Sequence, residues 1–156
     1  STMDIGIKES DRKKVADKLQ KLLADEHVIY IKTRNYHWNI KAANFAELHA
    51  FYEEQYGELE GVIDEIAERI RMIGFLSTGR MSEFLKLTEL KEGKEITDSG
   101  EQVSNLMKDH ESVIKYLRNC IRDFEDLNDM GSADFVTALM QQHEKMRWML
   151  ESFLPK

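Results

Sequence analysis

The sequence has few of the residues that interrupt helices or cross-link chains. It holds one proline and 8 glycines in 156 residues, and this scarcity favours long helices over many turns. The single cysteine, Cys120, excludes a disulfide framework and is typical of a reducing cytoplasm. No apolar run approaches the ~20 residues that span a bilayer. The polar N-terminus also differs from a secretory signal.

What the sequence does contain is an ordinary balance of residue types with an acidic excess. Hydrophobic residues make up 42% of the chain, enough to build a core, so we expect a single domain over residues 1–156 with a short tail at 1–8. The formal net charge of −7 argues against broad nucleic-acid binding and favours a protein that handles cations. The same charge also fits a domain that is merely kept in solution, so charge alone leaves both readings open.

Four long stretches follow the period of a helix, and a long connection separates the second from the third. The connection, residues 74–98, is too long to be structureless in a compact domain, and we expect a short helix within 82–90. This pattern predicts an all-α, ferritin-like four-helix bundle with a short extra helix in the long crossover between the second and third helices. The four stretches are approximately 9–37, 44–73, 99–124 and one that follows an N-cap at Gly131-Ser132 and reaches 153.

Two histidines and two acidic residues form the most informative part of the chain. His37 stands in His-Trp-Asn-Ile, His49 ends Phe-Ala-Glu-Leu-His, and Asp64 and Glu68 belong to Asp-Glu-Ile-Ala-Glu-Arg-Ile. These are ligand types that Fe(II) accepts. One helix that holds both His49 and Asp64 separates them by about 22 Å. We therefore expect a second chain to complete any metal site built from these residues.

Acidic residues continue the line of His49 along the second helix. On a helical wheel Glu53, Glu60, Asp64 and Glu68 fall within an arc of about 100° from His49. A stripe of this kind beside an apolar face is usually a solvated surface. It becomes a metal-binding surface only if another feature brings its two ends together.

Two glycines in the same stripe supply such a feature. Gly57 and Gly61 each cost roughly 1 kcal/mol relative to alanine in a helix interior, and close approach of another backbone is a reason to keep them. If two copies of the helix cross antiparallel there, His49 of one chain faces Asp64 and Glu68 of the other. Two-fold symmetry then gives two identical sites per dimer.

The remaining histidines and one apolar segment have less specific interpretations. Antiparallel packing brings His37 and His49 to a similar height, whereas His27, His110 and His143 fall near the core register and are interpreted as structural. No glutamate has a histidine three residues later, so the Glu-x-x-His pairs of di-iron sites inside one bundle are missing. The segment 28–31 is apolar around most of its helix, which fits a subunit contact or deep burial equally well.

Together these motifs resemble those of the Dps family, the bacterial and archaeal miniferritins. The similarity covers nearly the whole chain, including the short helix in the crossover and the His-Glu-Lys-Met-Arg-Trp segment at 143–148. The resemblance implies a hollow, cytoplasmic shell of twelve subunits with a ferroxidase centre at each two-fold interface. It also implies that Fe(II) is oxidised by hydrogen peroxide in preference to dioxygen and is stored as a ferric mineral.

The resemblance also assigns roles to individual residues. It implies that His37 and His49 of one subunit and Asp64 and Glu68 of the other bind iron. The next ligand position is usually aspartate in the family and is Glu53 here, which leaves its coordination open. The turn that commonly contains Gly-Pro is Ala42-Ala43 in this chain, and Trp38 is either a redox relay beside the centre or a packing residue. Acidic residues near the start of the last helix are expected to line an iron-entry pore: Asp134, with Asp126, Asp129 and Glu125 nearby.

Two other functions compete with iron oxidation. The first is a nucleoid-associated DNA-binding protein with a vestigial metal site, and the second is an assembly that binds Zn²⁺ or another divalent ion without turnover. DNA-condensing members of the family often have a lysine-rich tail, whereas residues 1–9 contain one lysine. With a net charge of −7 we expect weak or absent DNA binding at physiological salt.

Overall fold

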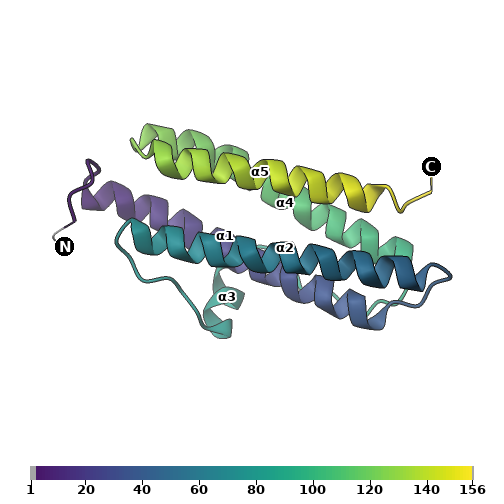
Figure 1. Cartoon of the computed structure of the whole chain (residues 1–156). Helices are drawn as coiled ribbons and strands as arrows, with labels where there is room; N and C mark the ends of the chain where they lie inside the picture. Colours follow the sequence, from purple (N-terminus) through teal and green to yellow (C-terminus); the bar gives the residue numbers. More distant parts are fainter. Residues whose placement is uncertain (1–2, 156) are drawn as a thin grey trace.

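The computed structural model, which describes residues 3–155, contains four long helices and one short helix. As Figure 1 shows, α1 and α2 run side by side, α4 and α5 form the other pair, and α3 lies in the connection between the pairs. This is the expected all-α bundle with a long crossover. The bounds are Glu9–Asn39 for α1, Phe45–Met72 for α2, Met81–Leu87 for α3, Ser99–Asp126 for α4 and Met130–Glu151 for α5.

The inward faces of the four long helices form the core because apolar residues recur on one side of each. The larger hydrophobic cluster includes Leu19, Ile66 and Leu117, which are fully buried. A smaller cluster near the α1–α2 turn includes Tyr36 and Tyr52. No helix within residues 3–155 combines the length and apolar character that a membrane span requires.

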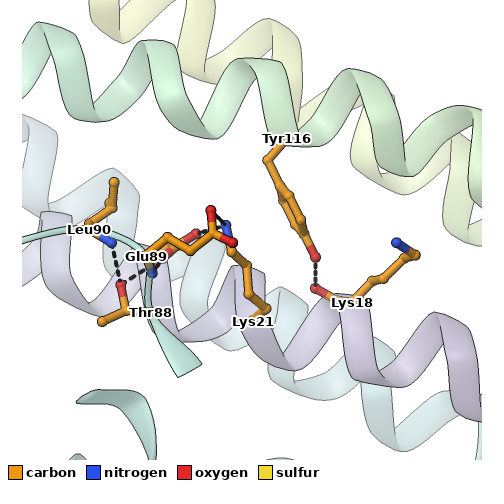
Figure 2. A network of polar contacts seen from close by, with 7 residues as sticks. Lys18, Lys21, Thr88, Glu89, Leu90 and Tyr116 are labelled. Atoms are coloured by element: carbon orange, nitrogen blue, oxygen red, sulfur yellow. Dashed lines mark hydrogen bonds and ion pairs between the residues drawn. The ribbon is translucent and has the colours of Figure 1, made fainter. Parts of the chain in front are cut away.

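The crossover is attached to α1 by side chains rather than left as a free loop. The buried Asp25 carboxylate accepts hydrogen bonds from the Thr88 hydroxyl at 2.6 Å and the Glu89 amide at 3.0 Å. Lys21 pairs with Asp25 at 2.6 Å, and its ammonium group lies 3.9 Å from the centre of the Tyr116 ring. Figure 2 shows Thr88 and Glu89 beside Lys21, with Tyr116 of α4 facing α1; these contacts hold the segment just after α3 against α1, and α1 against α4. The position of α3 follows from these contacts.

The predicted start of the last helix was wrong by a few residues. Gly131-Ser132 lies inside α5, and the N-cap is Asp129, whose carboxylate accepts a hydrogen bond from the Ser132 amide at 2.9 Å. Asn128 adopts a positive φ of 64°, the left-handed conformation that often follows a helix end. Helix α4 therefore ends and α5 begins within a turn of only three residues, Leu127–Asp129.

The N-terminal segment, as far as it is described, lies against the bundle. The buried Arg12 side chain donates to the Ile7 carbonyl at 3.0 Å and to the Ile73 carbonyl at 2.8 Å. Asn128 donates to the Gly6 carbonyl at 3.4 Å. Residues 1 and 2 of the expected tail, and residue 156 of the expected domain, lie outside the described residues.

Candidate metal centre

The turn between α1 and α2 brings two histidines together. His37 lies in the last turn of α1 and His49 in the second turn of α2. Their rings stack with centroids 3.7 Å apart and an interplanar angle of 12°. The turn needs no glycine, because neither Ala42 nor Ala43 has a positive φ. The departure from Gly-Pro at these two positions therefore leaves the histidine pair in place.

Each histidine is oriented by the main chain of the other. His37 Nδ1 donates to the His49 carbonyl at 2.6 Å, and His49 Nδ1 donates to the His37 carbonyl at 2.7 Å. A carbonyl oxygen only accepts, so both rings carry their proton on Nδ1 and keep a lone pair on Nε2 when neutral. This is the arrangement of a metal-binding imidazole whose second nitrogen is held by a hydrogen bond.

Glu53 is the carboxylate beside this pair. Its Oε1 lies 3.9 Å from His37 Nε2, too far for a hydrogen bond. Two donors that each sit about 2.1 Å from one ion are at most about 4.2 Å apart, so the spacing fits a shared ion. Tyr56 packs edge-on against His37 with centroids 5.3 Å apart, and Phe45 stacks on His49 at 4.9 Å. These rings restrict the histidines to the observed orientation.

Asp64 and Glu68 lie on the same continuous helix, four to five turns beyond His49. Both side chains are exposed. The 15-residue separation from His49 to Asp64 corresponds to about 22 Å along α2. Within residues 3–155, no group of three or more His, Cys, Asp and Glu side chains lies close enough to hold a metal ion. The structure thus pairs His37 with His49, sets Glu53 beside His37, and leaves Asp64 and Glu68 apart from them.

The surface between the two groups is open. Gly57 and Gly61 are exposed, and a Cβ atom at either position would meet no heavy atom of the surrounding structure within 4 Å. Both glycines line a hollow of about 610 Å³ that also includes Asp64. Neither glycine therefore serves a close contact within its own chain, and the hollow leaves space for a second backbone.

A second, more apolar hollow adjoins this surface. It has a volume of about 340 Å³ and lies between α1, α3 and residues 92–95. Ile31, Met81 and Leu85 line it and are 41%, 70% and 56% exposed. Val28 is buried, so the segment 28–31 is covered on one side by its own chain and open on the other.

Trp38 follows His37 but points away from the packed interior. It is 61% exposed, and the Arg34 guanidinium carbon lies 4.9 Å from the centre of its ring. Trp38 therefore contacts Arg34 at the surface and lies outside the core of the subunit, and its role as a redox relay stays a prediction.

The expected pore residues divide into two kinds. Asp126, Asp134 and Glu125 are exposed near the α4–α5 turn. Asp129 is buried, and its two oxygens accept from the Ser132 amide and hydroxyl at 2.9 and 2.6 Å. Within the subunit Asp129 therefore caps α5, and the acidic channel stays a prediction.

One contact near the site motif was not anticipated from the sequence. Arg69, which follows Glu68, donates to the Ser132 hydroxyl at 3.0 Å and pairs with Asp129 at 3.4 Å. It ties the end of α2, where the two carboxylates lie, to the start of α5. The Glu-Arg dipeptide was visible in the sequence, but its partner is 60 residues away and has no local signal.

The chain was compared with known proteins. A family model for the ferritin-like domain matches residues 16–156. The chain is 40% identical over 154 residues to a low temperature-induced protein of Nostoc sp., covering 97% of this chain and 86% of that one. It is 34% identical over 151 residues to the DNA protection during starvation protein of Porphyromonas gingivalis, covering 97% and 95%.

Solved structures have the same fold. A Dps protein from Vibrio cholerae, described as a member of a broad superfamily of ferritin-like diiron-carboxylate proteins, superposes with a TM-score of 0.94. It shares 32% identity and covers 99% of this chain and 97% of its own. The match of the family model, the identity to named relatives and the common fold agree along nearly the full sequence. The chain therefore belongs to the Dps family of miniferritins, within the ferritin-like superfamily.

Proposed function

We propose that this protein is a ferroxidase and iron store whose substrate, Fe(II), binds between two subunits. The observation that carries the proposal is the pair His37 and His49, with Glu53 beside it. Two imidazoles with outward Nε2 lone pairs and one carboxylate provide borderline and hard donors, which suit Fe(II). Three donors leave coordination positions open for an oxidant.

The second half of the centre comes from the partner subunit in this proposal. Asp64 and Glu68 are exposed, one turn apart, and about 22 Å from His49 along α2. An antiparallel crossing at Gly57 and Gly61 would set them opposite the histidines of the other chain and produce two equivalent centres. The open hollow at these glycines supports the crossing. The exposed apolar side chains around Ile31 would be covered in the same dimer.

The chemistry of the proposed reaction is a two-electron oxidation. Two Fe(II) ions each give one electron to one hydrogen peroxide molecule, whose O–O bond breaks to yield water-level oxygen. The resulting Fe(III) hydrolyses to ferric oxyhydroxide and releases protons. Removal of Fe(II) and peroxide in one step prevents one-electron formation of hydroxyl radical, which supports a role in protection against oxidative stress. Dioxygen is the alternative oxidant, and Zn²⁺ is a redox-inert substitute at the same donors.

Storage of the product requires an enclosed assembly. We infer a shell of twelve subunits, which Fe(II) enters through channels near Asp126 and Asp134. Exposed carboxylates at a narrow channel attract cations by concentrating negative potential.

The proposal is tested by following Fe(II) oxidation and peroxide consumption together in the unsubstituted protein and in Asp64→Ala/Glu68→Ala. Both residues are exposed, so the variant should fold and assemble normally. We expect its oxidation rate to fall to that of Fe(II) in buffer. Unchanged rates in the variant would exclude these carboxylates, and metal binding without peroxide consumption in the unsubstituted protein would favour the redox-inert role.

A further inference from the structure

A chain of buried polar groups crosses the bundle core, away from the proposed metal centre. His143 on α5 lies between Glu26 on α1 and His110 on α4, and all three side chains are fully buried. His143 Nε2 is 2.6 Å from a Glu26 oxygen, and its Nδ1 is 2.8 Å from His110 Nδ1. The two hydrogen bonds join three of the four long helices.

The geometry of this chain excludes a shared metal ion. His143 uses opposite ring nitrogens for its two partners, so the three groups form a line and do not surround a point. Two buried atoms at the ends, Glu26 Oε1 and His110 Nε2, have no hydrogen-bond partner in the protein. Buried polar atoms without hydrogen-bond partners raise the free energy of the folded state, so these three side chains make the core less stable than a fully bonded set would.

The hydrogen bond between the two rings limits how many protons the chain can hold. A bond from Nδ1 to Nδ1 needs one nitrogen with a hydrogen and one with a lone pair. If both His110 and His143 become imidazolium ions, two N–H groups face each other at 2.8 Å and two like charges meet in the core. In this doubly protonated state the hydrogen bond between His110 of α4 and His143 of α5 is lost.

Few other charges are available to compensate for a second proton. Two other buried charged side chains of α1 are committed elsewhere: Lys32 pairs with Asp109 of α4 at 2.8 Å, and Asp25 pairs with Lys21 at 2.6 Å. Helix α2 contributes the neutral Gln55, whose amide donates to the Met146 carbonyl at 3.1 Å. Among the described residues, Glu26 is thus the one carboxylate that contacts either ring, and it already pairs with His143 at 2.6 Å.

We propose that the Glu26–His143–His110 chain is an acid-sensitive lock, which holds the bundle closed until both imidazoles are protonated and then opens it. Burial, followed by the neighbouring His143, lowers the pKa of His110 well below its ordinary value. The closed form therefore binds fewer protons at His110 than the open form. The open form becomes more favourable as the pH falls through the ordinary histidine range, near 6.5. This lock is independent of iron oxidation.

The lock is tested by amide hydrogen exchange of the assembled protein at pH 7.5 and pH 5.5, read in segments 106–114 and 139–147. When the pH falls from 7.5 to 5.5, the equilibrium constant for local opening should rise about tenfold more in the unsubstituted protein than in His110→Leu. The reason is that the substitution removes one ionisable group. His27→Leu is the matched control, since His27 is half-buried, stacks on Phe84 and makes no hydrogen bond to Glu26, His143 or His110. Its pH dependence should equal that of the unsubstituted protein.

A second measurement covers the case in which His110→Leu does not fold. Hydrogen exchange at the imidazole C2 position, read by mass spectrometry, gives the ionisation midpoint of each histidine in the unsubstituted protein. We expect a midpoint for His110 that lies well below the ordinary histidine value, because burial and the neighbouring His143 lower its pKa. An ordinary midpoint for His110 in the closed protein, or equal pH dependence of opening in the unsubstituted protein and His110→Leu, would overturn the proposal.

Discussion

The main chain, more than neighbouring side chains, controls the orientation of His37 and His49. Each Nδ1 donates its hydrogen to the other residue's carbonyl, so each neutral ring keeps the lone pair of its Nε2 free for a metal ion. This rigidity lowers the conformational cost of binding an ion. Glu53 is less restricted than the two histidines. Its side chain is 64% exposed, and its Oε1 lies 3.9 Å from His37 Nε2, beyond hydrogen-bond distance. Glu53 is therefore the adjustable member of the group.

We expect that Glu53→Gln weakens Fe(II) binding and leaves the fold intact. The amide keeps the size of the side chain and removes its charge, so the dissociation constant for Fe(II) should rise at least about tenfold. Anaerobic calorimetric titration with Fe(II) measures this. Glu54→Gln is the matched control, because Glu54 is also exposed on α2 and should leave the constant unchanged. Equal effects of the two substitutions would exclude Glu53 as a ligand.

Among the helices, the junction of α4 and α5 depends on one buried carboxylate. Asp129 caps α5, binds the Ser132 hydroxyl and pairs with Arg69 of α2. A capping residue contributes roughly 1 kcal/mol, and a hydrogen-bonded ion pair at a part-buried site adds to that. This junction also positions Asp126 and Asp134, the two exposed acidic residues assigned to the entry channel.

Asp129→Ala should therefore destabilise the protein, whereas Asp126→Ala should not. We expect a loss of about 2 kcal/mol for Asp129→Ala, seen as a Tm lower by about 4–8 °C. Asp126 is exposed in the last turn of α4, where a negative charge is unfavourable, so its removal should change stability by less than about 0.5 kcal/mol. Differential scanning calorimetry compares the two. A stable Asp129→Ala variant would show that the cap and the ion pair contribute little.

The helices could be predicted from the sequence because their signals are local. Apolar period and scarce glycine and proline predicted four long helices with bounds close to those observed, and the length of the connection predicted a short helix within 82–90, which is α3. The cap at Asp129 was missed because Ser132 and Asp129 are both good capping residues, and the choice depends on Arg69 from another helix. The reciprocal bonds of His37 and His49 were missed for a similar reason, since they depend on the path of the turn.

For the whole molecule, the central question is why the two halves of the candidate site lie far apart in one chain. A continuous α2 of 28 residues cannot bend His49 towards Asp64. The exposed glycines between them cost helix stability without any contact inside the chain. Both facts are explained together by a second copy that crosses at the glycines. The stability of the assembly and the ferroxidase activity should then both depend on the two glycines of α2.

Replacing both glycines with leucine should separate folding from assembly. Gly57→Leu/Gly61→Leu adds side chains where a Cβ meets nothing within 4 Å, so the single chain should keep its helix content and gain helix propensity. The two-fold contact should be blocked, and light scattering should detect species smaller than twelve times the 18.3 kDa chain. Glu58→Leu, an exposed position elsewhere on α2, is the control and should assemble normally. Full assembly of the double variant would contradict the crossing.

The surface also predicts weak binding to DNA. The net charge is −7, Arg12 is buried, Lys13 pairs with Asp17, and the described N-terminal residues lie against the bundle, so the described part of this segment does not extend as a cationic arm for phosphate contacts. A gel shift with plasmid DNA at neutral pH and physiological salt should show little retention, with some recovery at low salt. Tight retention that is lost on removal of residues 1–8 would instead support the DNA-binding function.

The most direct test of the shared centre is to mix two inactive variants. One lacks the histidines (His37→Ala/His49→Ala) and the other lacks the carboxylates (Asp64→Ala/Glu68→Ala). Co-assembly at equal amounts places both variants in half of the dimers, and one of the two centres in each mixed dimer then has its complete set of native ligands. We expect recovery of about a quarter of the wild-type ferroxidase activity after co-assembly. If each centre were built within one chain, the co-assembled protein would stay as inactive as its parents, and that result would contradict the account.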